Sequence, residues 1–116
     1  MSYIVYQLKL AQNKHYFGHT PFWRKQIRID EHKRGGGAKW TTRFPPVENP
    51  VVETWAFNTR KKANFFENQK CEEYLKKYGI DSTRGGKQNY GDVGKNYEWW
   101  VRKHLWFLVP TDYKYE

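Results

Sequence analysis

The chain has 116 residues, room for one domain with a modest core, and a formal charge of +9 from 21 lysines and arginines against 12 acidic residues. Its 6 Trp, 9 Tyr and 7 Phe argue against a disordered chain, because disordered segments are poor in aromatic residues. Basic domains of this kind most often bind nucleic acid, and an anionic membrane surface is the second choice.

The location that the composition favours is intracellular and soluble, in the cytoplasm or in a eukaryotic nucleus. Cys71 is the only cysteine, which excludes an internal disulfide and fits a reducing compartment. Residues 1–6 lack the basic region and long apolar run of a signal peptide, and no stretch approaches the ~20 apolar residues that span a bilayer. One Cys and four scattered His give no zinc-ligand spacing, which argues against a zinc protein.

The first half of the chain predicts a hairpin followed by a helix. Apolar residues alternate over residues 3–10, which predicts a strand, and residues 14–18 are expected to form its hairpin partner after a turn at 11–13. Thr20 and Pro21 have the chemistry of a helix N-cap and first helical residue, so the first helix is expected to run from there to Lys33. Arg34 and three glycines then end it.

The second half predicts a loop, a strand and a longer helix. Residues 38–50 carry three prolines and are expected to form a loop, and residues 51–57 the third strand. A second helix is expected over residues 60–78, capped by Asn58 or Thr59 and ended by Gly79. The order β-β-α-β-α predicts a single α+β domain with a small sheet flanked by helices.

The remaining residues carry less pattern. Residues 81–87 are basic and rich in glycine, and the only candidate boundary lies near residues 91–94. The tail over residues 91–116 is dense in aromatic residues, which cannot all face water without forming a large apolar patch. We expect the tail to dock on the core. The alternatives are a homodimer or other protein contact, or a surface that stacks on DNA.

Glu67 is the most unusual residue of the second helix. It lies on the apolar stripe of that helix, four residues from both Ala63 and Cys71, whereas Glu72 and Glu73 lie on the polar side. A carboxylate on a buried face is costly unless it is paired or bound to a cation. A structural ion pair, or a position at the edge of the stripe, remains the alternative.

Four more residues could contribute to the same chemistry. Arg28 and His32 lie one turn apart on the first helix, and with a nearby carboxylate they could clamp a phosphate. Tyr6 and Tyr16 lie on the two strands of the hairpin, close enough to meet. Tyrosine is also a common strand residue, and most buried tyrosines are simply hydrogen-bonded.

Together these positions resemble the GIY-YIG nuclease family in order and approximate spacing. The resemblance covers about residues 3–90, including a loop and a closing segment similar to those of one branch. The motifs are Ile4-Val5-Tyr6, Tyr16-Phe17-Gly18, Arg28-x-x-x-His32, Gly35-Gly36-Gly37-Ala38-Lys39-Trp40-Thr41, Ala63-x-x-x-Glu67, and Tyr78-Gly79-Ile80-Asp81 with Arg84-Gly85-Gly86. Three features depart from the family pattern: Ile4 replaces a glycine, the spacing from Gly18 to Arg28 is about two residues longer, and His19 stands where Lys or Arg is frequent.

The resemblance implies a three-stranded antiparallel sheet flanked by helices and an endonuclease that hydrolyses DNA with Mg²⁺ or Mn²⁺. Tyr6 would be the general base or orient the attacking water beside Tyr16. Arg28 would stabilise charge on the phosphate, His32 would hydrogen-bond within the site, and Glu67 would bind the metal. Whether His19 positions or deprotonates the water stays open. A free tyrosine is a poor base at neutral pH, so Arg28 and the metal are expected to lower the pKa of Tyr6.

The expected partner is duplex or branched DNA, and roles in repair, recombination, mobile elements and restriction all remain open. Trp40 would stack on a base or wedge a step, with capping of the core as the alternative. A non-catalytic nucleic-acid-binding module of the same fold is the competing function. The residues expected to contact DNA are Lys14, Gly18, Lys39, Trp40, Thr41, Arg43, Arg84 and Lys87.

Overall fold

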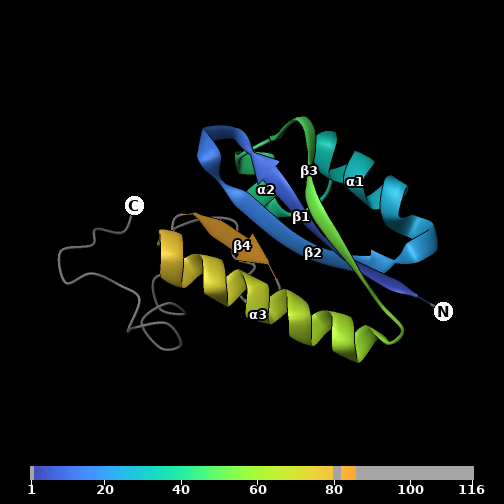
Figure 1. The fold of residues 1–116 in the computed structure, drawn as a ribbon. Helices are drawn as coiled ribbons and strands as arrows, with labels where there is room; N and C mark the ends of the chain where they lie inside the picture. Colours follow the sequence, from blue (N-terminus) through green and yellow to red (C-terminus); the bar gives the residue numbers. More distant parts are fainter. Residues whose placement is uncertain (1, 80–81, 86–116) are drawn as a thin grey trace.

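A computed structural model describes residues 2–79 and 82–85 of the chain, and these residues form a mixed α+β fold (Figure 1). Two short 3₁₀ turns, η1 (Ala11–Asn13) and η2 (Phe22–Arg24), connect larger elements. The strands and helices are β1 (Tyr3–Leu10), β2 (His15–Pro21), α1 (Lys25–Lys33), α2 (Lys39–Arg43), β3 (Pro46–Phe57), α3 (Arg60–Tyr78) and β4 (Thr83–Gly85).

The strands form one open sheet in the order β3-β1-β2-β4. β1 lies between two antiparallel neighbours, and its register with β2 sets Tyr6 opposite Gly18 and Leu8 opposite Tyr16. β4 pairs parallel with His15–Phe17 of β2. The described sheet therefore has four strands where three were expected. The fourth strand has only three residues and pairs with a distant segment, so it leaves no periodic pattern in the sequence.

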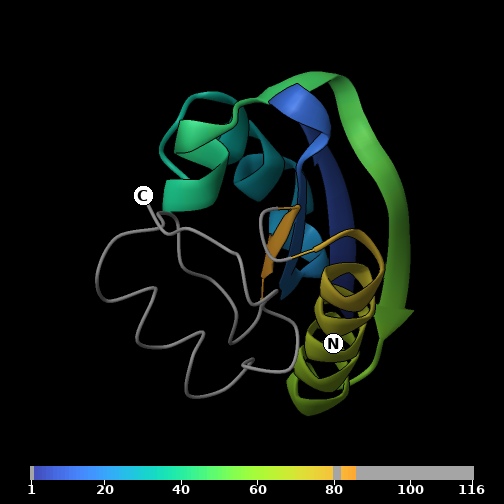
Figure 2. The ribbon, with the colours of Figure 1, turned by 90° about the vertical axis from the view of Figure 1, so that its left-hand side faces the viewer.

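Helices cover both faces of this sheet, with α1 and α2 on one face and α3 on the other (Figure 2). Strand side chains alternate between the two faces, so each strand contributes to both layers. Val5 and Phe17 are buried on the α3 side. The cluster on the α1 and α2 side consists of Tyr6, Leu8, Leu10, Tyr16, Ile29, Ala38, Trp40 and Phe44.

Helix α3 matches its sequence-based expectation in both bounds. The Thr59 hydroxyl accepts a hydrogen bond from the Lys62 amide at 3.2 Å, which caps the first turn. Gly79 ends the helix with a positive φ of 94°, a conformation that favours glycine. The buried side chains of α3 are Ala63, Glu67, Cys71 and Leu75, so Glu67 does lie on the face that packs against the sheet.

The expected helix start at Thr20 and Pro21 is wrong. Both residues belong to β2, where Thr20 pairs with Ile4 and Pro21 with Tyr3. The sheet ladder takes precedence over the local capping chemistry, and α1 begins only at Lys25, after the η2 turn. The hairpin partner is correspondingly longer than the expected residues 14–18.

The expected loop over residues 38–50 is also wrong. It contains the short helix α2 and the first part of β3, which starts at Pro46 and continues through Pro50. Prolines are compatible with this strand because β3 lies at the edge of the sheet, where a missing N–H need not break a ladder on both sides.

The expected boundary near residues 91–94, the docked tail over residues 91–116 and Lys87 lie outside the described residues. None of the helices within residues 2–79 and 82–85 is long and apolar enough to cross a membrane.

Candidate active site

A pocket of about 260 Å³ opens beside β2 and gathers side chains from four elements. β1 contributes one tyrosine, β2 three residues, α1 an arginine and α3 three further polar residues. The lining residues are Tyr6, Tyr16, Gly18, His19, Arg28, Arg60, Asn64 and Glu67. Six of these eight were singled out from the sequence as site or DNA-contact residues.

The strand pairing explains why the pocket lies here. Within the described part of the chain, β4 pairs with β2 only as far as Phe17, so β4 does not cover the outer edge of β2 from Gly18 onward. Tyr16 and Gly18 occupy positions on the α1 face of the sheet. His19, the residue after Gly18, has its side chain on the opposite face, toward α3. The pocket therefore collects groups from both faces of the sheet around one edge.

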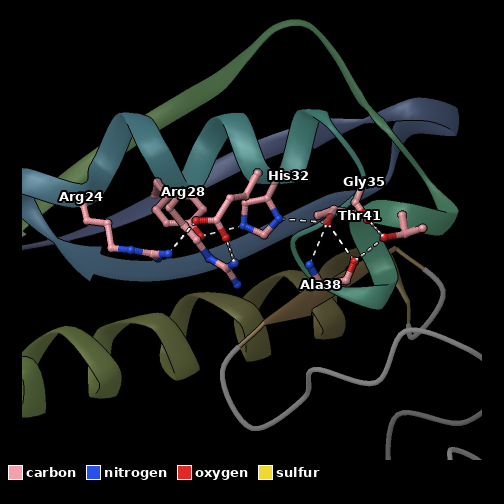
Figure 3. Close-up of polar contacts among 9 residues, drawn as sticks. Arg24, Arg28, His32, Gly35, Ala38 and Thr41 are labelled. Atoms are coloured by element: carbon pink, nitrogen blue, oxygen red, sulfur yellow. Dashed lines mark hydrogen bonds and ion pairs between the residues drawn. The ribbon is translucent and has the colours of Figure 1, made fainter.

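Tyr6, His32 and Thr41 form a buried chain of hydrogen bonds (Figure 3). The Thr41 hydroxyl donates to the Ala38 carbonyl at 3.0 Å, so toward His32 Nδ1, 2.9 Å away, it can only accept. Nδ1 therefore carries the ring proton, and Nε2 accepts from the Tyr6 hydroxyl at 2.8 Å. In this tautomer the Tyr6 hydroxyl is the donor and His32 Nε2 the acceptor.

Burial sets the protonation of these groups. It lowers the pKa of His32 to about 4, with Arg28 acting in the same direction, so the imidazole is neutral at pH 7. Burial also raises the pKa of Tyr6, with Tyr16 adding to the effect, and Arg28 opposes the rise only partly. The pKa of Tyr16 is raised to about 12, again mainly by burial. Arg28 does lower the pKa of Tyr6, as expected, but in the protein alone desolvation has the larger effect, so the net pKa is raised where a lowered value was expected.

Arg28 is held in place by a carboxylate on its own helix. Glu31 accepts from Arg28 Nη1 at 3.0 Å and from Arg24 Nη2 at 2.6 Å, so it bridges two guanidinium groups (Figure 3). Arg24 and Glu31 are therefore not simply solvated surface charges. The bridge fixes the side chain of Arg28, while its remaining donors are close enough to Tyr6 and Tyr16 to affect the pKa values of both.

Glu67 and His19 meet on the α3 side of the pocket. The Glu67 carboxylate is almost fully buried and accepts a hydrogen bond from Nδ1 of His19. Within residues 2–79 and 82–85, no three His, Cys, Asp or Glu side chains gather closely enough to hold a metal ion by themselves. The donor set still fits Mg²⁺, which commonly takes one carboxylate and completes its shell with substrate phosphates and water.

Three residues expected to contact DNA belong to the core instead. Trp40 is buried, its indole N–H donates to the His15 carbonyl at 3.0 Å, and the Arg84 guanidinium lies 4.2 Å from its ring centre. Arg84 is itself buried, and Thr41 is the buried partner of His32. Trp40 and Thr41 are buried because the Gly-rich segment leads into α2, which packs its inner side against the sheet, whereas Arg84 is buried in β4 beside the Trp40 ring.

Three of the other expected DNA contacts, Lys14, Lys39 and Arg43, lie at or near the surface. Lys39 and Arg43 are exposed, and Lys14 is half-buried with its ammonium group 5.2 Å above the Phe44 ring. Gly18 lines the pocket itself. These four residues remain predictions for contact with a phosphate backbone.

Two pocket residues were not recognised as site residues from the sequence. These are Arg60 and Asn64, both from α3. With Glu67 they occur at positions i, i+4 and i+7 of α3, which share one helical face. That spacing was the available signal.

No family model, curated protein or solved structure matches the chain. The functional conclusion therefore depends on the chemistry of this pocket.

Proposed function

We propose that the chain is a metal-dependent endonuclease that hydrolyses phosphodiester bonds of DNA, as its resemblance to GIY-YIG nucleases implies. The observation that best supports this function is that Tyr6, Arg28 and Glu67, from three separate elements, line one pocket. A base, a cation and a metal-binding carboxylate around one cavity are the parts that phosphodiester hydrolysis requires.

Tyr6 and His32 supply the base. A water that attacks phosphorus gives a proton to the Tyr6 oxygen, and Tyr6 passes its own proton to Nε2 of His32. The neutral imidazole can accept that proton because Nε2 carries a free pair of electrons directed at the Tyr6 hydroxyl. The low pKa of His32 in the protein alone favours return of the proton after the reaction. A phosphate bound near His32 would raise that pKa during the reaction.

Arg28 stabilises the phosphate during the attack. Its planar guanidinium donates to phosphate oxygens on which negative charge develops, and Glu31 holds it in position beforehand. Arg60 lies on the α3 wall of the same pocket and adds a second positive charge. Two arginines from opposite walls suit a single phosphodiester group.

Glu67 would hold Mg²⁺ or Mn²⁺, and a bound ion would supply a Lewis acid at the leaving oxygen. His19 donates to the Glu67 carboxylate and thereby orients it. Because one carboxylate is a weak site on its own, substrate phosphates would complete the coordination.

The test is cleavage of labelled intact, nicked, flapped and single-stranded DNA with Mg²⁺ or Mn²⁺ by the wild type, Glu67→Gln and Glu73→Gln. Glu73 is the matched control, because it is exposed on the same helix and pairs with Lys70. We expect Glu67→Gln to abolish cleavage while it keeps its fold and DNA binding, and Glu73→Gln to cut normally. Normal cleavage by Glu67→Gln would refute the role of Glu67.

The second candidate is a DNA-binding module without catalysis. It is favoured by the raised pKa of Tyr6 and by the engagement of Arg28 and Glu67 with Glu31 and His19. This candidate predicts salt-sensitive DNA binding but no cleavage of any of the four substrates with either metal.

A further inference from the structure

Three large apolar side chains stand exposed together at the start of α1. Phe22 and Trp23 are 61% and 65% exposed in the η2 turn, and Ile27, one turn further along, is 49% exposed. We call Phe22, Trp23 and Ile27 the aromatic patch. Apolar side chains grouped on a surface in this way mark a site of interaction.

The aromatic patch is linked to the candidate active site through Arg24 and Glu31. Trp23 precedes Arg24, and Arg24 shares the Glu31 carboxylate with Arg28, which lines the pocket. Arg28 comes five positions after Trp23, a distance along the chain of roughly 8 Å at a rise of about 1.5–2 Å per residue. That length corresponds to about two nucleotide steps of ~3.4 Å along a DNA strand.

The surroundings of the patch are basic. Arg24 and Lys25 lie between Trp23 and Ile27 in the chain, and α3 begins with the exposed run Arg60, Lys61 and Lys62. The starts of α1 and α3 lie at the same end of the molecule (Figure 1). An aromatic surface between positive charges suits a nucleic acid better than an apolar protein surface, because the phosphates match the charges and the bases match the rings.

Exposed aromatic rings favour some DNA structures over others, because they need a free base face on which to stack. In a continuous duplex the bases are stacked on each other and offer no free face to an external ring. At a nick, flap or branch the stack is interrupted, and an aromatic side chain can fill the opening. We propose that Phe22 and Trp23 stack on the base exposed at such an interruption, so that the preferred substrate is duplex DNA with a break in its base stack near the bond to be cut.

This proposal rests on the proposed nuclease function and names its substrate class. It also gives Trp23 the stacking role that the sequence suggested for Trp40, whose ring is buried against Arg84 and Phe44.

The experiment compares single-turnover cleavage of nicked, flapped and intact duplexes of one sequence by the full chain. The variants are Trp23→Ala, Trp23→Phe and Phe22→Ala, and Phe65→Ala is the matched control because Phe65 is 68% exposed on α3. We expect Trp23→Ala and Phe22→Ala to lower the rate ratio of nicked to intact duplex roughly tenfold, the scale of one lost base–ring stack. Trp23→Phe and Phe65→Ala should keep the ratio of the wild type.

A second measurement does not require cleavage. 2-Aminopurine placed beside the nick reports stacking through its fluorescence, which wild type should quench on binding and Trp23→Ala should not. If the wild type cuts no substrate, the nuclease function fails, and this fluorescence difference still decides whether the patch stacks on DNA.

Three outcomes would overturn the proposal. An unchanged rate ratio together with unchanged quenching in Trp23→Ala would show that the ring does not stack. An equal loss in Phe65→Ala would show a general effect of exposed aromatic area. A wild-type dimer that Trp23→Ala converts to a monomer, with the rate ratio kept, would show that the patch binds a second copy of this chain.

Discussion

His32 should make the stability of the fold depend on pH in a defined window. Burial lowers the pKa of His32 from 6.5 to about 4, so the unfolded chain binds a proton near pH 6.5 and the folded chain only near pH 4. The unfolded state thus holds more protons between these values, and the free energy of unfolding falls as the pH falls through the window. The contribution is complete above pH 6.5. At ~1.36 kcal/mol per pKa unit, about 3 kcal/mol is lost by pH 4.

The assay is urea unfolding followed by circular dichroism at intervals from pH 7.5 to pH 4, with wild type and His32→Gln. All other ionisable groups are the same in the two proteins, so the difference between the two curves isolates the contribution of His32. The variant should be less stable at pH 7, because His32 bonds to both Tyr6 and Thr41. That difference should shrink by about 3 kcal/mol on acidification. Parallel curves would refute the buried neutral imidazole and with it the assigned tautomer.

Four further measurements test the site and its support. Arg28→Ala should slow single-turnover cleavage at least ~100-fold, and Arg28→Lys should recover only part, because an ammonium lacks the guanidinium fork; full activity in the lysine variant would contradict this role. Thr20→Val should raise the free energy of unfolding by about 1 kcal/mol in urea melts, since the Thr20 hydroxyl is buried with no hydrogen-bond partner among the described residues; a loss of stability would contradict it. Gly37→Ala would put a Cβ 2.7 Å from Cε1 of the buried His32 ring and should cost about 1–3 kcal/mol, whereas Gly36→Ala has room and should be nearly neutral in the same melts. Calorimetry should detect weak Mg²⁺ binding to the free protein and tighter binding to its DNA complex, because Glu67 is the only carboxylate among the described residues that line the pocket. A tight site in the free protein would reveal a second ligand.

Local signals in the sequence were sufficient to predict α3 and part of the site. The cap at Thr59, the stop at Gly79 and the apolar stripe all act within the helix itself, so its bounds and the buried face of Glu67 could be predicted. The nearness of Tyr6 and Tyr16 follows from the hairpin, whose register sets Tyr16 two positions from the partner of Tyr6. Their rings lie 6.3 Å apart.

The remaining features depend on contacts between distant segments. β4 exists because Thr83–Gly85 meets β2, and no pattern within three residues indicates that pairing. Thr20 has the chemistry of a helix cap, yet the ladder with β1 determines its structure. Trp40 and Thr41 occur in a segment that looks like a flexible surface loop, and only the packing of α2 shows that both are buried.

Substitution of Gly18, which pairs with Tyr6 in the sheet, should abolish the proposed cleavage without altering the charge of the protein. A Cβ at Gly18 would lie 2.5 Å from Tyr6 Cζ and 2.9 Å from Tyr16 Cε2, too close for the buried Tyr6 ring to keep its position. A single methyl group there would displace the Tyr6 hydroxyl from His32 and leave the net charge of the protein unchanged. Glu67→Gln, by contrast, makes the protein one unit more positive and so strengthens its attraction for any polyanion. A Gly18→Ala protein is therefore the better trap for capturing natural substrates, because its electrostatic attraction for DNA would equal that of the native chain.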